Sequence, residues 1–186
     1  MVVPHYARNG LALVTGASSG IGAAFARKLA QRGNDLVVVA RRRDRLENLA
    51  AELAGSHGTK VEIMVADLAE ADDLHRVEQR LEQGGIDLLV NNAGIGDIAL
   101  FAEQKRDIHE RMIAINVLAL TRLAHAAVAA MLPRGSGAII NIGSGFAFDY
   151  MPGASVYAAT KSFVVQLTPV LDEGMGKQVL GLQGLI

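Results

Sequence analysis

The sequence predicts a three-layer α/β fold with a doubly wound parallel sheet, in a single domain that covers residues 1–186. Three observations support this prediction. Short, β-branched apolar runs alternate with helical patterns, a glycine-rich turn directly follows the first run, and polar residues follow several later runs. Continuous apolar runs are typical of parallel strands that helices cover on both faces. A length of 186 residues is enough for one domain with a sizeable core.

The elements follow one another as strand and helix along the chain. The predicted strands are residues 11–15, 36–40, 61–66, 86–90 and 138–142, with a sixth at 179–182. The predicted helices are residues 21–31, 46–53 and 74–81, one or two within 102–131, and 155 to about 170. We expect Gly55 and the Gly84–Gly85 pair to end the second and third helices, and Pro169 to kink or end the last. Ligands of such sheets bind at the carboxyl ends of the strands.

Composition excludes several classes of function. With 18 basic and 19 acidic residues the net charge is −1, so nothing indicates a nucleic acid or an anionic membrane as partner. The absence of cysteine excludes disulfide scaffolds, cysteine zinc sites and thiol catalysis. The five histidines are scattered without ligand spacing, so we expect no metal site.

No targeting or membrane segment is expected. Residues 1–10 lack the apolar region of a secretory signal. The nearest approach to a membrane span, residues 112–132, is interrupted by polar residues such as Asn116 and Arg122. We therefore interpret it as a buried helix of a soluble, cytoplasmic protein.

The turn after the first strand is a candidate phosphate-binding site. Its glycines, Gly16, Gly20 and Gly22, would permit a tight turn, close approach of a pyrophosphate and close helix packing. The following helix begins at Ile21, where free N–H groups and the positive end of the dipole attract phosphate. Ser18 and Ser19 could add hydroxyl hydrogen bonds. The alternative is a structural turn with a serine N-cap.

The end of the second strand predicts which dinucleotide binds. An acidic residue there usually holds a ribose 2′-hydroxyl, whereas arginine suits a 2′-phosphate. This chain has Arg41 and Arg42 at that point, and Arg41 is the better placed. We therefore predict NADP(H) rather than NAD(H). A solvated charge cluster at a helix start is the alternative, although cations at that end oppose the helix dipole.

Residues after the third and fourth strands extend the candidate site. Asp67, with Leu68 beside it, could accept a hydrogen bond from the adenine amino group, or Asp67 could cap the next helix. Asn91, Ala93 and Gly94 belong to an Asn-Asn-Ala-Gly turn that suits a backbone facing a ligand, with a plain turn as the alternative.

These motifs, together with Asn116, Ser144, Tyr157 and Lys161, resemble the short-chain dehydrogenase/reductase family from about residue 11 to residue 161. The resemblance implies a Rossmann-like domain. It also implies hydride transfer between NAD(P) and a small carbonyl or alcohol substrate. Because the family is often dimeric or tetrameric, the resemblance further implies a homo-oligomer.

The candidate catalytic residues are Asn116, Ser144, Tyr157 and Lys161. Tyr157 and Lys161 lie four residues apart and so share one helix face. A nearby ammonium favours the phenolate, so we expect Lys161 to lower the pKa of Tyr157, which would exchange a proton with the substrate oxygen. Ser144 would orient that oxygen. By resemblance, Lys161 also binds the nicotinamide ribose and Asn116 holds a water of a proton relay.

The sequence departs from the family after about residue 168. Family members continue with a Pro-Gly pair after a strand, a substrate loop and a last strand, and here the sequence stops at Ile186 without a Pro-Gly pair. We expect that region to be missing or altered, in a shortened or fragmentary chain or in one completed by a partner. Two functions therefore remain: an NADP(H)-dependent reductase or dehydrogenase, and a non-catalytic dinucleotide-binding or interaction protein. Residues 95–101 and 146–154 are largely apolar and hint at an apolar substrate.

Overall fold

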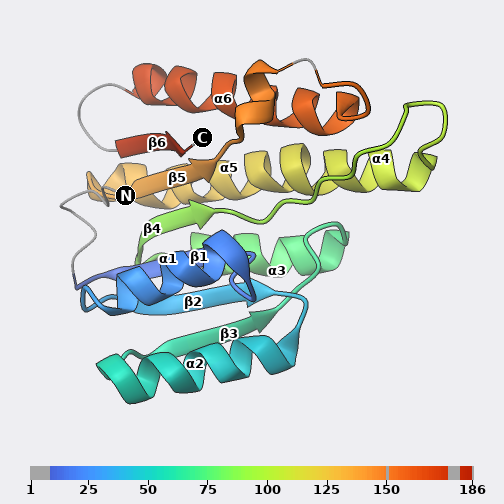
Figure 1. The fold of residues 1–186 in the computed structure, drawn as a ribbon. Coiled ribbons are helices and arrows are strands. Elements are labelled where there is room, and N and C mark those ends of the chain that lie inside the picture. The colour runs from blue at the N-terminus through green and yellow to red at the C-terminus, as the bar shows by residue number, and fades with distance from the viewer. Residues whose placement is uncertain (1–8, 150, 176–180, 186) are drawn as a thin grey trace.

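A parallel sheet of six strands forms the centre of the molecule (Figure 1). The computed structural model describes residues 9–149, 151–175 and 181–185. The strands are β1 (Leu11–Thr15), β2 (Asp35–Ala40), β3 (Val61–Val65), β4 (Ile86–Asn91), β5 (Ala138–Ile142) and β6 (Gly181–Leu185). They lie in the order β3-β2-β1-β4-β5-β6, and every neighbouring pair is parallel. The expected doubly wound fold is confirmed, and its strand order reverses between β1 and β4, where a crevice forms.

Helices cover both faces of the sheet. They are α1 (Gly20–Ala30), α2 (Arg43–His57), α3 (Ala71–Glu82), α4 (Arg106–Ile113), α5 (Leu120–Met131) and α6 (Ser155–Met175), with the π-helical turn η2 (Ala114–Ala119) and the 3-10 turns η3 (Leu132–Arg134) and η4 (Gly145–Phe148). Helices α1 and α2 pack on one face, and α3, α5 and the end of α6 pack on the other (Figure 1).

The apolar runs of the sequence follow from this double cover. In β1, Ala12 and Val14 enter the core beneath α1 and α2, whereas Leu13 enters the core beneath α3 and α5. All three are fully buried, because successive side chains of a strand point to opposite faces and both faces are covered.

Residues 106–134 form one long helical stretch, α4-η2-α5-η3. Within the described part of the chain, it is the one helix that is long and apolar enough to cross a membrane, with a mean hydropathy of 1.6. Half of its most apolar window is buried in the protein, and α5 packs against α3 and β4. That placement is typical of a core helix, which is how residues 112–132 were expected to fold.

The predicted end of the second helix at Gly55 is wrong, and of the two outcomes expected at Pro169, a kink or an end, the helix does not end there. Gly55 lies inside α2, where nothing restricts a side chain, and the helix ends instead at Gly58 in the left-handed region, with φ +66°. Pro169 lies inside α6, which continues to Met175. The buried Thr168 hydroxyl accepts from Asn141 on β5 at 3.1 Å, and Leu171 packs on the second core. These contacts hold the last turns of α6 in place despite the proline.

The sixth strand occurs, displaced toward the C-terminus. It pairs in parallel with β5 from Ala138↔Gly181 to Ile142↔Leu185. Residues 179 and 180 of the predicted strand lie outside the described residues, as do residues 1–8, where no signal sequence was expected.

Candidate dinucleotide and active site

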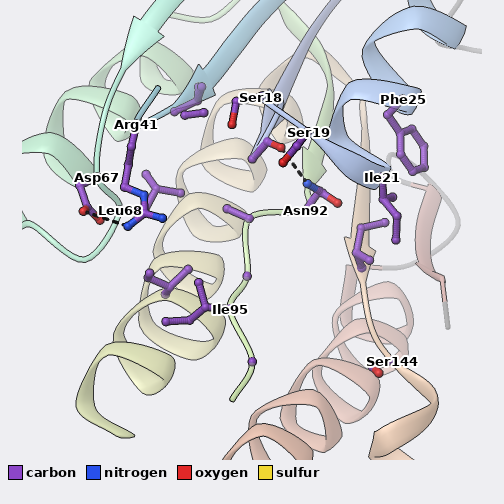
Figure 2. Close-up of a pocket in the computed structure, with 18 of the residues that line it drawn as sticks. Ser18, Ser19, Ile21, Phe25, Arg41, Asp67, Leu68, Asn92, Ile95 and Ser144 are labelled. Atoms are coloured by element: carbon purple, nitrogen blue, oxygen red, sulfur yellow. Dashed lines mark hydrogen bonds and ion pairs between the residues drawn. The ribbon is translucent and has the colours of Figure 1, made fainter. Parts of the chain in front are cut away.

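A cleft of about 860 Å³ opens at the carboxyl ends of the strands, at the point where the strand order reverses (Figure 2). Thirteen of the sequence-predicted site residues line it: Gly16, Ser18, Ser19, Ile21, Arg41, Arg42, Asp67, Leu68, Ala93, Gly94, Ser144, Tyr157 and Lys161. Asp67 and Ser144 lie at opposite ends of this cleft (Figure 2). Its volume falls in the range that small-molecule and cofactor sites occupy.

The turn after β1 needs its glycines for two different reasons. Gly16 has φ +66°, a backbone conformation that residues other than glycine rarely adopt. A Cβ on Gly22 would lie 2.4 Å from the Gly16 carbonyl oxygen and 2.5 Å from Asn92 Nδ2. The first glycine therefore forms the turn, and the other lets α1 start directly against it.

The start of α1 has no side-chain cap. Ser19 is the N-cap residue, but its hydroxyl makes no hydrogen bond to the first turn of the helix. Arg42 Nη2 instead donates to Ser18 Oγ and Ser19 Oγ, both at 2.8 Å. The serine cap that the alternative interpretation requires is therefore absent from the start of α1. The first N–H groups of α1 keep their capacity to bind an anion.

Thr15 and Asn92 join the turn after β1 to the turn after β4. The buried Thr15 hydroxyl donates to the Val90 carbonyl oxygen and accepts from the N–H groups of Asn92 and Ala93, each at 3.0 Å. The Asn92 side chain donates to the Thr15 carbonyl oxygen at 2.9 Å. These bonds cross the reversal of strand order and fix the two walls of the cleft relative to each other.

One carboxylate joins the second and third strands at the rim. Asp67 Oδ1 accepts from the N–H of Ala69 at 3.1 Å, and the N-cap of α3 is Glu70, so Asp67 is not the helix cap. Arg111 Nη2 on α4 donates to Asp67 Oδ2, and Arg41 Nη1 lies 3.8 Å from that same oxygen (Figure 2 shows the Arg41–Asp67 pair).

Tyr157 and Lys161 lie at the other end of the cleft, on successive turns of α6. Lys161 is 6% exposed, its Nζ donates to the Ile142 carbonyl oxygen at 2.8 Å, and it lies 5.9 Å from the centre of the Tyr157 ring. Burial lowers the pKa of Lys161 below its ordinary value, because desolvation disfavours the ammonium. Phe146 packs edge-on to the Tyr157 ring at 5.5 Å, and a Cβ on Gly96 would lie 3.0 Å from that ring.

Asn116 lies in the π-helical turn and holds the chain after β4. Its Oδ1 accepts from the N–H of Ile95 at 2.9 Å, and its Nδ2 donates to the Ile95 carbonyl oxygen and to Thr160 Oγ1. A Cβ on Gly94 would lie 3.3 Å from Asn116 Oδ1 and 3.5 Å from Lys161 Nζ. Asn116 thus ties the loop that carries Gly94 to the helix that carries Lys161.

Four predicted site residues do not line the cleft: Gly20, Gly22, Asn91 and Asn116. The first two lie at the start of α1, and Asn116 lies behind Ile95. The Asn91 side chain is buried, where it donates to the Leu120 carbonyl oxygen and to Asn141 Oδ1. It joins β4, β5 and α5 within the core.

Ser144 is the N-cap of η4, and its Oγ accepts from the N–H of Phe146 at 3.3 Å. Sequence reasoning used Asn92 only as part of the Asn-Asn-Ala-Gly turn and Gly96 only as part of residues 95–101, and it assigned no role to Thr15 or Arg111. A polar residue at the end of an apolar strand, directly before a glycine turn, could have indicated Thr15. No sequence signal connects Arg111 to Asp67, 44 residues away.

The sequence profile described as short chain dehydrogenase matches residues 10–180. The chain belongs to the short-chain dehydrogenase/reductase family. The expected family and class of enzyme are therefore confirmed.

Solved structures of the family agree in fold. The bulky-bulky ketone specific alcohol dehydrogenase from Comamonas testosteroni is 40% identical with a TM-score of 0.92, over 94% of this chain and 71% of that chain. A short-chain dehydrogenase from Sphingobium yanoikuyae in complex with NADPH is 44% identical with a TM-score of 0.89, over 94% of this chain and 69% of that chain. The very-long-chain 3-oxoacyl-CoA reductase of the duck Anas platyrhynchos is 34% identical over 160 residues. The matched region spans 51% of the length of that reductase.

The residues of the cleft fit a nicotinamide dinucleotide. The glycine turn leaves no space for side chains at Gly16 and Gly22, so the backbone itself faces the ligand. The uncapped start of α1 suits the pyrophosphate, and Arg41 and Arg42 add positive charge at one end of the cleft.

Proposed function

We propose that the chain is an NADP(H)-dependent oxidoreductase that transfers hydride between the nicotinamide and a carbonyl or alcohol substrate. The observation that carries the proposal is that Tyr157, Lys161 and Ser144 line the same cleft as the glycine turn and the two arginines. When bound, the cofactor supplies or accepts the hydride. The proposal also takes residues 1–186 as one dinucleotide-binding domain.

The cofactor-binding residues divide the dinucleotide among them. The start of α1, with Gly16, Ser18, Ser19, Gly20, Ile21 and Gly22, would hold the pyrophosphate. Arg41 and Arg42 would bind a 2′-phosphate, for which guanidinium geometry is suited. Asp67 and Leu68 would contact the adenine, and the backbone of Asn91, Ala93 and Gly94 would follow the ribose toward the nicotinamide.

The catalytic residues handle a proton and an oxygen atom. Tyr157 would give its proton to the carbonyl oxygen during reduction and remove one from the alcohol during oxidation. Ser144 would donate a hydrogen bond that orients that oxygen. Lys161 would bind the nicotinamide ribose and favour the charged form of the phenol.

Asn116 would hold a water of the proton relay. Both N–H groups of its amide already donate, to Ile95 and to Thr160. The water would therefore be held by a carbonyl oxygen of Asn116.

Replacement of one atom tests the proposal. We expect Tyr157→Phe to reduce turnover about 10²- to 10⁴-fold, the range ascribed to general acid–base catalysis. The affinity for NADPH should change less than about twofold. The measurement is NADPH oxidation with a panel of ketones and aldehydes, beside calorimetric titration of NADPH. A Tyr157→Phe protein that keeps its activity contradicts the assignment.

A second candidate is a dinucleotide-binding or interaction protein without turnover. It is favoured by the exposed apolar side chains near the catalytic end, namely Ile98, Leu100, Phe101, Phe148 and Met151. Tight NADPH binding without turnover on any carbonyl compound would support it. If there is turnover, the same side chains favour substrates with bulky apolar groups, which agrees with the ketone-specific relative.

The proposed setting is the cytoplasm, and the proposed assembly is a homo-oligomer. Ile113, Leu118, Phe163 and Val170 are exposed on α4, η2 and α6, where a second copy could cover them. Light scattering after size exclusion reports the mass in solution, and a monomer at micromolar concentration would contradict the assembly.

A further inference from the structure

We propose that Arg111 is a positioning residue for cofactor selection, which holds the Asp67 carboxylate so that Arg41 stays available for the 2′-phosphate. The inference rests on the proposed preference for NADP(H). It concerns a residue outside the cleft, since Asp67 and Arg41 line the cleft and Arg111 does not.

The geometry is a competition for one oxygen atom. Arg111 Nη2 is hydrogen-bonded to Asp67 Oδ2, and Arg41 Nη1 lies 3.8 Å from it, beyond hydrogen-bond distance. The other carboxylate oxygen accepts from the Ala69 N–H. Arg111 therefore has the close contact and Arg41 the loose one.

The closer of the two arginines, Arg111, is also the more buried one. The side chain of Asp67 is 24% exposed, that of Arg111 34% and that of Arg41 57%. Solvent screens such a partly exposed ion pair less than one at the open surface, so the carboxylate favours its nearer and less exposed cation, Arg111. The Asp67–Arg111 pair is the more buried one, and Arg41 keeps an exposed guanidinium at the rim.

Among the residues that the structure describes, Arg41 and Arg111 are the cations paired with Asp67. The neighbouring Arg76 donates to Asp73 and to the Val65 carbonyl oxygen, and Asp73 accepts from the N–H of Asp67. If Arg111 is removed, the nearest cation that the structure gives Asp67 is Arg41. The carboxylate would then draw Arg41 away from the position that the 2′-phosphate needs, and would repel the phosphate as well.

The selectivity for the phosphate therefore depends on an element of the opposite half of the sheet. Arg111 belongs to α4, which follows β4, whereas Arg41 and Asp67 follow β2 and β3. Ile115, one turn beyond Arg111, lines the cleft. Helix α4 and the turn after it thus reach the site twice, through Ile115 in the wall of the cleft and through Arg111 behind Asp67.

The test is calorimetric titration of NADPH and NADH with the purified protein and its variants. We expect Arg111→Met to weaken NADPH binding about fivefold and NADH binding less than twofold, in keeping with the loss of one partly exposed charge contact. Arg111→Lys should restore most of the preference. Arg106→Met, which removes an equal charge from an exposed position on the same helix, should leave the NADPH/NADH ratio unchanged.

A double variant, in which Arg111→Met is added to Asp67→Asn, shows whether Arg111 acts through Asp67. In Asp67→Asn, whose own NADPH/NADH ratio should stay at or above that of the parent, adding Arg111→Met should change the ratio less than twofold. A full fivefold change there means that Arg111 acts on the phosphate directly, and it overturns the inference. Equal weakening of both cofactors by Arg111→Met, with a lowered unfolding midpoint, indicates a structural role and also overturns it.

The affinities of the unmodified protein for NADPH and NADH test the proposed cofactor preference separately from the role of Arg111. A parent that binds NADH as well as NADPH overturns the cofactor preference itself. A parent that prefers NADPH, with an unchanged preference in Arg111→Met, overturns only the role of Arg111.

Discussion

The two ends of the cleft are built from different kinds of interaction. At the phosphate end the backbone does most of the shaping, through the Gly16 turn and the uncapped start of α1, and the polar side chains are paired. Arg42 bonds two serine hydroxyls there, and Asp67 lies between two arginines. At the catalytic end individual side chains dominate, and Lys161 is a buried cation bonded to a carbonyl oxygen.

This difference indicates that the demands of stability and function conflict at the catalytic end of the cleft. At the phosphate end the polar side chains have partners before any ligand binds, and only the uncapped first N–H groups of α1 are left for the anion. A desolvated ammonium opposes folding, and its reduced pKa reflects that opposition. Exposed apolar side chains near the catalytic end, such as Phe101 and Phe148, likewise favour a contact that the described residues do not provide.

The largest effect on stability is expected where the two ends join. Thr15→Val keeps the shape of the side chain but removes the acceptor of the Ala93 N–H. The Asn92 N–H keeps a second acceptor, the Val90 carbonyl oxygen at 3.0 Å. We expect a loss of about 1–3 kcal/mol, the cost of one donor left unpaired. Urea unfolding measures it.

The matched control is Thr121→Val. The Thr121 hydroxyl donates only within its own helix, to the Val117 carbonyl oxygen, so about 0.5 kcal/mol or less is expected. If the two variants lose equal stability, the Thr15 hydroxyl does not hold the ends together.

A smaller effect should separate the two ends by function. A Cβ at Gly96 would lie 3.0 Å from the Tyr157 ring, so Gly96→Ala should displace the phenol by a few tenths of an ångström. We expect kcat to fall about tenfold, because turnover is sensitive to such displacements. NADPH affinity, which depends on the phosphate end, should change less than twofold.

Gly145→Ala serves as its control. Gly145 also lines the cleft, and nothing lies within 4 Å of the Cβ it would gain. Similar losses of kcat in both variants would show that Gly96 does not set the position of Tyr157.

The smallest effect concerns the charge at Lys161. Its folded-state pKa lies below the ordinary value of 10.5, so between the two values the unfolded chain binds more protons than the folded protein. The contribution of Lys161 to stability should therefore rise as the pH rises through that window toward 10.5. Urea unfolding of the parent and of Lys161→Met from pH 7 to 10 isolates it.

The difference between parent and variant removes the titration of the groups that do not interact with Lys161. A difference that stays constant with pH, or that falls as the pH rises, would show that Lys161 is not buried as a disfavoured cation.

Local patterns allowed much of this fold to be predicted. The runs at Leu11–Thr15 and Ala138–Ile142 coincide with β1 and β5, because strands covered on both faces are predominantly apolar. The turn from Gly16 to Gly22 was readable because glycine is needed wherever the backbone turns or packs closely. Local signals failed at Gly55 and Pro169, where the rest of α2 and the contacts of α6 outweigh one unfavourable residue.

The sequence by itself determined the alternation of strands and helices, the glycine turn and the candidate residues Tyr157 and Lys161, since each depends on neighbours within a few positions. The tertiary structure alone decided that Arg42 bonds Ser18 and Ser19, that Arg111 holds Asp67, and that the Asn91 side chain lies in the core. Those contacts join residues 23 to 44 positions apart. Packing of whole elements brings such residues together, and no local pattern of side chains encodes it.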